Sequence, residues 1–175
     1  MTEAFDPGPL ADVGTEVGDG TWTLVLTREL RHAPALVWAA LTEPGQLEAW
    51  SPFTADRDLG TPGDATLTHI DGEVHEDIPA KVIRAERPRL LEYTWGPDLL
   101  RWELEPTAAG TRLTLRHQTA DPEMVSKVAA GWHLCLVVAE HLLDGDPIGP
   151  IRGQDATNYG WDDLNEAYAK RLADG

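Results

Sequence analysis

Hydrophobic side chains recur at three- and four-residue steps along residues 121–144, in the sequence DPEMVSKVAAGWHLCLVVAEHLLD. This spacing places them on one face of a helix with 3.6 residues per turn and predicts one long amphipathic helix. Asp121 is placed to cap its start, Pro122 suits the first helical position, and Gly145 suits its end. Such a helix is roughly 34 Å long, enough to cross the sheet of a small domain. We therefore expect any chemistry of the protein to lie between this helix and a sheet.

Strict alternation of apolar and polar side chains predicts strands before this helix. Residues 21–27 alternate in this way and follow a turn at residues 18–20, which predicts a hairpin. Between residues 50 and 119, Gly- and Pro-containing turns come at strand spacing and predict an antiparallel meander of roughly six strands. In residues 99–106 and 111–118 one face is apolar and the other is charged. The inner face of this sheet is therefore expected to meet the long helix.

Prolines and a second apolar stripe predict the remaining helices. Pro34 and Pro44 stand where two short helices are expected to begin, because proline is tolerated in a first helical turn. Apolar residues at helical spacing predict a further amphipathic helix over residues 161–172. With 175 residues and 42% hydrophobic content, the sequence predicts a single domain over residues 10–173. Residues 1–9 lack periodicity and are predicted to be a disordered N-terminus.

Charge and cysteine content argue against several classes of function. The 30 Asp and Glu residues outnumber the 14 Lys and Arg residues, and the formal net charge is −16. Such a field repels nucleic acid and anionic lipid, and no apolar run approaches the length of a membrane span. We expect a cytoplasmic protein with neither nucleic acid nor membrane as a partner. Cys135 lies in the apolar stripe, where a small buried side chain is favoured over a reactive thiol.

Two segments carry a resemblance to a known superfamily. Residues 28–50 read RELRHAPALVWAALTEPGQLEAW, and residues 131–145 read GWHLCLVVAEHLLDG. On these motifs, and on the order of strand, two short helices, meander and long helix, the chain resembles the SRPBCC, or START-like, superfamily. Within it, the chain is similar to the activator of heat-shock-protein-ninety ATPase homologue-like domain. The resemblance covers about residues 18–145 and implies an α+β helix-grip fold, a curved antiparallel sheet wrapped around a long C-terminal helix, here followed by a short terminal helix.

The resemblance also implies a deep, mainly hydrophobic cavity between sheet and helix, used across the superfamily for lipids, hormones, polyketides and other apolar ligands. Members include aromatic-ring cyclases. The true chaperone activators carry a further domain that grips the chaperone, and this chain offers no counterpart, so a chaperone partner stays open. From the alternation pattern, we expect the cavity wall to comprise Trp50, Phe53, His69, Tyr93, Trp95, Trp102, His117, Trp132 and Leu136. The competing interpretation for each tryptophan is a filled core, and for each histidine a structural hydrogen bond.

Three hypotheses remain, and each assigns the protein to a different functional class. The leading hypothesis is a carrier or sensor that binds a small apolar or aromatic molecule, which needs only a cavity. The second is a cyclase- or dehydratase-like enzyme that uses His117 or His69 with Tyr93 as acid and base. The third is a stress-linked protein that binds a chaperone or a transcription factor. Motifs for a nucleophile, a phosphate loop, a dinucleotide or a metal are missing, so we expect no cofactor and no metal. The sequence leaves a homodimer and the identity of the ligand open.

Overall fold

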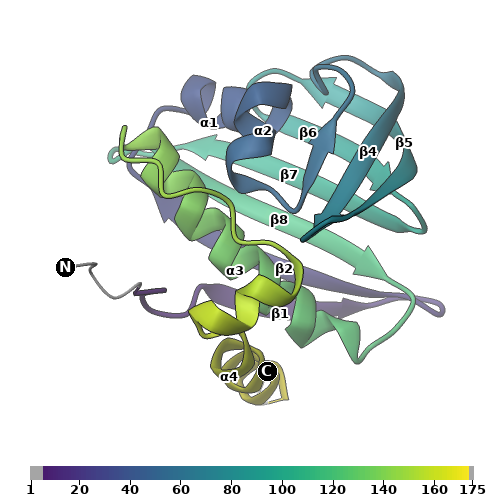
Figure 1. Ribbon diagram of the computed structural model, residues 1–175, viewed down its shortest axis with the longest axis vertical. Helices are drawn as coiled ribbons and strands as arrows, with labels where there is room; N and C mark the ends of the chain where they lie inside the picture. Colours follow the sequence, from purple (N-terminus) through teal and green to yellow (C-terminus); the bar gives the residue numbers. More distant parts are fainter. Residues whose placement is uncertain (1–5, 174–175) are drawn as a thin grey trace.

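The computed structural model describes residues 6–173, and its eight strands form one antiparallel sheet (Figure 1). The strands are β1 (Asp12–Val17), β2 (Trp22–Leu30), β3 (Phe53–Ala55), β4 (Gly63–Asp71), β5 (Val74–Glu86), β6 (Leu90–Trp95), β7 (Asp98–Pro106) and β8 (Thr111–Thr119). Their order across the sheet is β1-β2-β8-β7-β6-β5-β4-β3. Strands β3 to β8 thus form the predicted meander, and β2 closes onto β8, so the first hairpin lies beside the last strand.

The helices gather on one face of the sheet. They are α1 (Pro34–Thr42), α2 (Pro44–Trp50), α3 (Met124–Leu143), the short 3-10 helix η1 (Gly153–Tyr159) and α4 (Trp161–Ala173). Figure 1 shows α3 crossing the concave side of the sheet, with α1 and α2 near its C-terminal end. The chain after α3 turns back along the outer side of this helix before reaching η1 and α4. This arrangement confirms the predicted helix-grip fold.

Helices α1 and α2 are separate because Glu43 between them has an extended backbone. Pro34 and Pro44 stand in the first turn of each helix, where a missing N–H removes no helical hydrogen bond. The two helices are held together by the indole N–H of Trp50, which donates to the carbonyl of Ala40 at 2.8 Å. The predicted break at this position is therefore confirmed.

The start of α3 differs from the prediction. The helix begins at Met124, because the side chain of Asp121 accepts the Glu123 N–H at 2.9 Å and forms a turn ahead of the helix. Its end agrees with the prediction, since Gly145 takes a left-handed backbone with φ of +81°. The Gly145 N–H donates to the carbonyl of Leu142 at 3.1 Å and closes the last turn.

Helix α3 is buried on two sides. Val125, Trp132, Leu136 and Ala139 belong to the predicted stripe and lie in the core with the sheet. Ala130, His133, Leu134 and Val137 are buried as well, because α4 and the segment before it cover the other side of the helix. The continuous apolar run at residues 134–139 is the part of the sequence that reflects burial on both sides.

A buried network around His133 joins α3, α4 and the N-terminal segment. His133 Nε2 lies 2.6 Å from the carbonyl oxygen of Pro7, which can only accept, so Nε2 carries the proton. Nδ1 then accepts the hydroxyl of Tyr168 at 2.6 Å, and that hydroxyl accepts the Ala11 N–H at 2.9 Å. Burial raises the pKa of Tyr168, so its hydroxyl keeps the proton that it donates. The imidazole is therefore neutral with both nitrogens satisfied.

The N-terminal segment had been predicted to be disordered over residues 1–9. Residues 1–5 lie outside the described part of the chain. Residues 6–9 form neither helix nor strand, and Pro7 is fixed to α3 by the hydrogen bond from His133. This contact reaches across the sequence, so a local pattern could not show it.

We expect the free energy of unfolding to fall as the pH is lowered from about 7 to about 5, in part through His133. Burial lowers the pKa of His133 below its ordinary value. Below about pH 6.5 the unfolded chain therefore binds a proton that the folded chain resists, whereas above it both states are neutral. Urea denaturation at a series of pH values measures this slope.

The matched variants are His133→Gln, which keeps a donor and an acceptor but does not titrate, and His141→Gln at a more exposed position of the same helix. The first should flatten the pH dependence of unfolding, and the second should leave it nearly unchanged. An equal slope in wild type and His133→Gln would show that His133 does not carry the effect.

Candidate ligand-binding pocket

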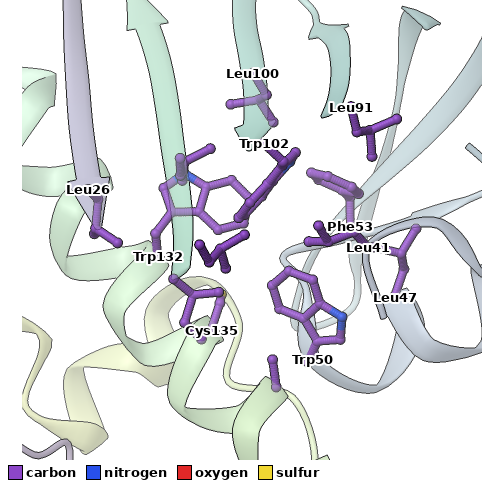
Figure 2. Close-up of a cluster of buried hydrophobic side chains, with 14 of the residues drawn as sticks. Leu26, Leu41, Leu47, Trp50, Phe53, Leu91, Leu100, Trp102, Trp132 and Cys135 are labelled. Carbon is purple, nitrogen blue, oxygen red and sulfur yellow. The ribbon is translucent and has the colours of Figure 1, made fainter. Parts of the chain in front are cut away.

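The nine residues predicted for the cavity wall come together in space. Their rings contact one another in a continuous cluster, in which Phe53 and Trp95 have ring centroids 5.0 Å apart. Trp102 and Trp132 lie edge to face at 5.2 Å, and Leu136 belongs to the same core. Figure 2 shows Trp50, Phe53, Trp102 and Trp132 converging from α2, β3, β7 and α3.

The interior of this cluster is filled by the rings themselves. Trp50, Phe53, Tyr93 and Trp102 are each at most 1% exposed. Their neighbours are arranged mainly edge to face, the geometry that aromatic pairs prefer in direct contact. His69 and Trp95 are half-buried and lie at the edge of the cluster, with ring centroids 5.9 Å apart. Most of the predicted set therefore forms core, and its open side is at Trp95.

His117 links α3 to two strands. The indole N–H of Trp132 can only donate, so His117 Nδ1 accepts it at 2.9 Å. The proton is then on Nε2, which donates to Asp98 Oδ2 at 2.7 Å. His117 is 1% exposed, and both of its nitrogens are engaged within the protein. This arrangement is that of a structural histidine with a fixed tautomer.

Asp98 was not singled out from the sequence. It begins β7 directly after the β6–β7 turn and pairs with Trp95 across that hairpin. Its carboxylate meets His117 because β7 and β8 are neighbours, which only the strand register reveals.

Tyr93 is also engaged in the core. Its hydroxyl accepts the indole N–H of Trp102 at 3.2 Å. Burial raises the pKa of Tyr93 well above its ordinary value, and the hydrogen bond from Trp102 offsets only part of this effect. A phenol in this state is a poor proton donor near neutral pH.

An open pocket of about 190 Å³ lies at the edge of the aromatic cluster. It is bounded by the first half of α3, by Trp95 on β6 and by residues 151–161 of the segment that follows α3. The wall comprises Pro52, Trp95, Lys127, Val128, Gly131, Trp132, Leu134, Cys135, Ile151, Arg152, Gly153, Ala156 and Trp161. Of the nine predicted residues, Trp95 and Trp132 line this pocket.

Arg152 attaches the outer wall of the pocket to the end of α2. Its Nε donates to the carbonyl of Ser51 at 2.9 Å, and its Nη2 donates to the carbonyl of Glu48 at 2.7 Å. Carbonyls at a helix C-terminus lack helical partners and carry partial negative charge, so a guanidinium satisfies both needs. Ile151, next to it, is buried in the core.

Gly153 brings the same wall against the end of β4. Its backbone is left-handed, with φ of +54°, and a Cβ at this position would lie 1.9 Å from Asp71 Oδ1. The same carboxylate oxygen accepts the Gln154 N–H at 3.2 Å. A side chain at position 153 would therefore displace the segment from Asp71.

The charge states of the pocket groups follow from burial. Burial raises the pKa of the Cys135 thiol to about 12, although the positive charge of Arg152 opposes this shift. Cys135 is therefore a neutral thiol at physiological pH and contributes apolar surface. Burial lowers the pKa of Arg152, and the charge of Glu48 partly offsets this.

Residues 31–143 match the family described as Activator of Hsp90 ATPase homolog 1-like protein. The chain belongs to this family. The match confirms the resemblance seen in the sequence, and it ends at the last residue of α3. The outer wall of the pocket, residues 151–161, thus lies beyond the matched range. No curated protein sequence matches the chain.

Solved structures with the same fold come from several bacteria. CalU16 from Micromonospora echinospora superposes with a TM-score of 0.65 at 20% identity, covering 91% of this chain and 95% of its own. A protein from Rhodobacter sphaeroides superposes with a TM-score of 0.62 at 23% identity, covering 77% of this chain and 99% of its own. The AHSA1-like protein from Aeromonas hydrophila superposes with a TM-score of 0.60 at 16% identity, covering 70% of this chain and 92% of its own. These similarities establish the fold.

Two further features concern the described residues 6–173. No helix in this range is long and apolar enough to cross a membrane. No group of three or more His, Cys, Asp or Glu side chains in it is placed to hold a metal ion.

Replacing Trp132 with phenylalanine is expected to lower the free energy of unfolding by about 1–3 kcal/mol. The change keeps a ring in the cluster but leaves His117 Nδ1 buried without a donor. Urea denaturation measures the loss. The control is Trp22→Phe, since this half-buried indole makes no hydrogen bond within the described residues. Equal losses in the two variants would show that the hydrogen bond to His117 contributes little.

Gly153→Ala should destabilise the segment 151–161 more than Gly149→Ala does. Both glycines have positive φ, which costs an alanine about 1–2 kcal/mol, but a Cβ on Gly149 meets no atom within 4 Å. The Gly153 variant must in addition push away Asp71. Amide hydrogen exchange over residues 151–161 measures local opening, and equal exchange in both variants would contradict the role given to Asp71.

Proposed function

We propose that this protein binds a small apolar or aromatic molecule in the pocket between α3, β6 and residues 151–161. The observation that carries the proposal is the pocket itself, an open space of about 190 Å³ in which Trp95, Trp132 and Trp161 line the wall. The neighbouring interior is filled by side chains, so the space at its edge is where a ligand fits. Concave, mainly apolar sites with a few polar groups are typical of small-molecule binding.

The volume limits the size of the ligand. A cavity of about 150 Å³ holds one benzene ring, and pockets for drug-sized molecules begin near 300 Å³. A pocket of about 190 Å³ therefore suits one ring with a short substituent, or a short branched chain. Long lipids and fused polyketides exceed it.

The state of the polar groups favours binding over acid–base catalysis. His117 has both nitrogens hydrogen-bonded inside the core, and Tyr93 is hydrogen-bonded to Trp102. Neither residue lines the pocket, and the Cys135 thiol that does is neutral. We therefore favour a binder over the cyclase-like hypothesis.

One buried polar atom near the pocket has no hydrogen-bond partner within the described residues. The indole nitrogen of Trp95 is buried and has no hydrogen-bond acceptor within the described residues. Buried donors without acceptors are uncommon in folded proteins. This nitrogen is covered by the protein, so Trp95 contributes ring surface rather than its N–H to the pocket wall.

Nitrogen-15 NMR of the seven indole groups tests the proposal directly. The probe is phenylacetamide, a neutral molecule with one ring and a short substituent. We expect the indole signals of Trp95, Trp132 and Trp161 to shift in a saturable way, and those of Trp22 and Trp38, which are outside the pocket wall, to stay in place. Shifts confined to Trp22 or Trp38, or no saturable shift with either phenylacetamide or phenylacetate, would overturn the proposal.

A matched pair of variants at Gly131 tests the location. Gly131 lies in α3 and in the pocket wall, and a Cβ there would come no closer than 4.0 Å to Trp161. Gly131→Leu should fill the pocket and abolish the shifts, while Gly131→Ala should retain them. Both changes remove a helical glycine and should preserve or raise stability by up to about 1 kcal/mol. Retained binding in Gly131→Leu would place the site elsewhere.

A further inference from the structure

We infer that the ligand is an anion, an aryl or short-chain carboxylate whose charge is met by Lys127 and Arg152. This inference rests on the proposed function and specifies the chemical class of its ligand. The carboxylate would lie at the rim of the pocket beside these two cations, with the ring among Trp95, Trp132 and Trp161.

The pocket wall is basic, whereas the chain as a whole is acidic. Acidic residues outnumber basic ones by 30 to 14 in the whole sequence. The wall nevertheless contains two basic side chains and no carboxylate. In a protein with a net charge of −16, an anion is repelled at long range, so a site that takes one needs cations next to it. Lys127 and Arg152 provide these cations in the pocket wall.

Arg152 has a charge that its protein partners compensate only in part. Its hydrogen-bond acceptors are the carbonyl oxygens of Ser51 and Glu48, which are neutral groups. No salt bridge of the described residues involves Arg152, and its burial lowers its pKa. A guanidinium carries five N–H donors, so two carbonyls leave donors for a further acceptor. A carboxylate in the pocket supplies the missing countercharge, and charge-assisted hydrogen bonds of this kind are the strong ones.

Lys127 is a second cation without an ionic partner. It is exposed on the first half of α3, and no salt bridge of the described residues includes it. Glu123 lies one turn earlier but is not within salt-bridge distance. The ammonium group on its flexible stem is therefore free to reach over the rim of the pocket.

The pocket selects a carboxylate over a larger or more highly charged anion. Three indoles and several aliphatic side chains fill most of the wall, so the body of the ligand must be apolar. One ring with a carboxylate fits about 190 Å³, whereas a phosphate ester has about two charges and three charged oxygens, so it is larger and costs more to move from water to this apolar wall. An arylacetate meets both conditions.

The test compares phenylacetate with phenylacetamide, which have nearly the same shape and differ in charge. Titration followed by the indole signals of Trp95, Trp132 and Trp161 gives both dissociation constants. We expect phenylacetate to bind about tenfold more tightly at low salt, and this preference to shrink as salt is added. The neutral amide should show little salt dependence.

Two variants with the same change in net charge assign the effect to the pocket. Lys127→Gln should reduce the preference for phenylacetate over phenylacetamide by about threefold. Lys81→Gln, on the exposed side of β5 and outside the pocket wall, should preserve the preference.

The outcomes separate this inference from the function on which it rests. Equal affinity for the two probes, or tighter binding of the amide, would overturn the anionic ligand and leave the binding function standing. Equal loss of the preference in Lys127→Gln and Lys81→Gln would show a general charge effect and also overturn it. Failure of both probes to bind would overturn the proposed function together with this inference.

Discussion

The packing of Trp132 against the sheet is the contact on which the rest of the structure depends. Its ring lies edge to face on Trp102, and its N–H donates to His117, which in turn donates to Asp98. One side chain of α3 thereby fixes the height of the helix above β7 and β8. Because the rings fill the space beneath the helix, the apolar pocket lies at the edge of the cluster, where Trp132 and Trp95 also line its wall.

The pocket is completed by a part of the chain beyond the range that defines the family. The family match ends with α3, whereas Ile151, Arg152, Ala156 and Trp161 form the outer wall. Polar contacts to α2 and β4 hold this wall in place, through Arg152 and through the close approach of Gly153 to Asp71. The inner wall of the pocket therefore lies within the matched range, and its outer wall lies beyond it.

The sequence predicted the fold well because each element has a local signature. Alternation located the strands, and spacing located α3, whose start was misplaced only because Asp121 caps a turn ahead of the helix. The candidate site was harder to predict from the sequence. Alternation shows which side chains point inward, but whether their volumes fill the space depends on packing in three dimensions. The segment around Arg152 has no periodicity, and its anchors at Ser51 and Asp71 are far away in the sequence.

Burial of α3 on two sides has a consequence for ligand exchange. The side facing the sheet is fixed by rings, while the side facing residues 151–161 is covered by a segment held mainly through Arg152 and Asp71. A ligand at the proposed site would touch both α3 and this segment, so it would bind the docked arrangement better than an undocked one. Binding would then stabilise docking by the same differential free energy.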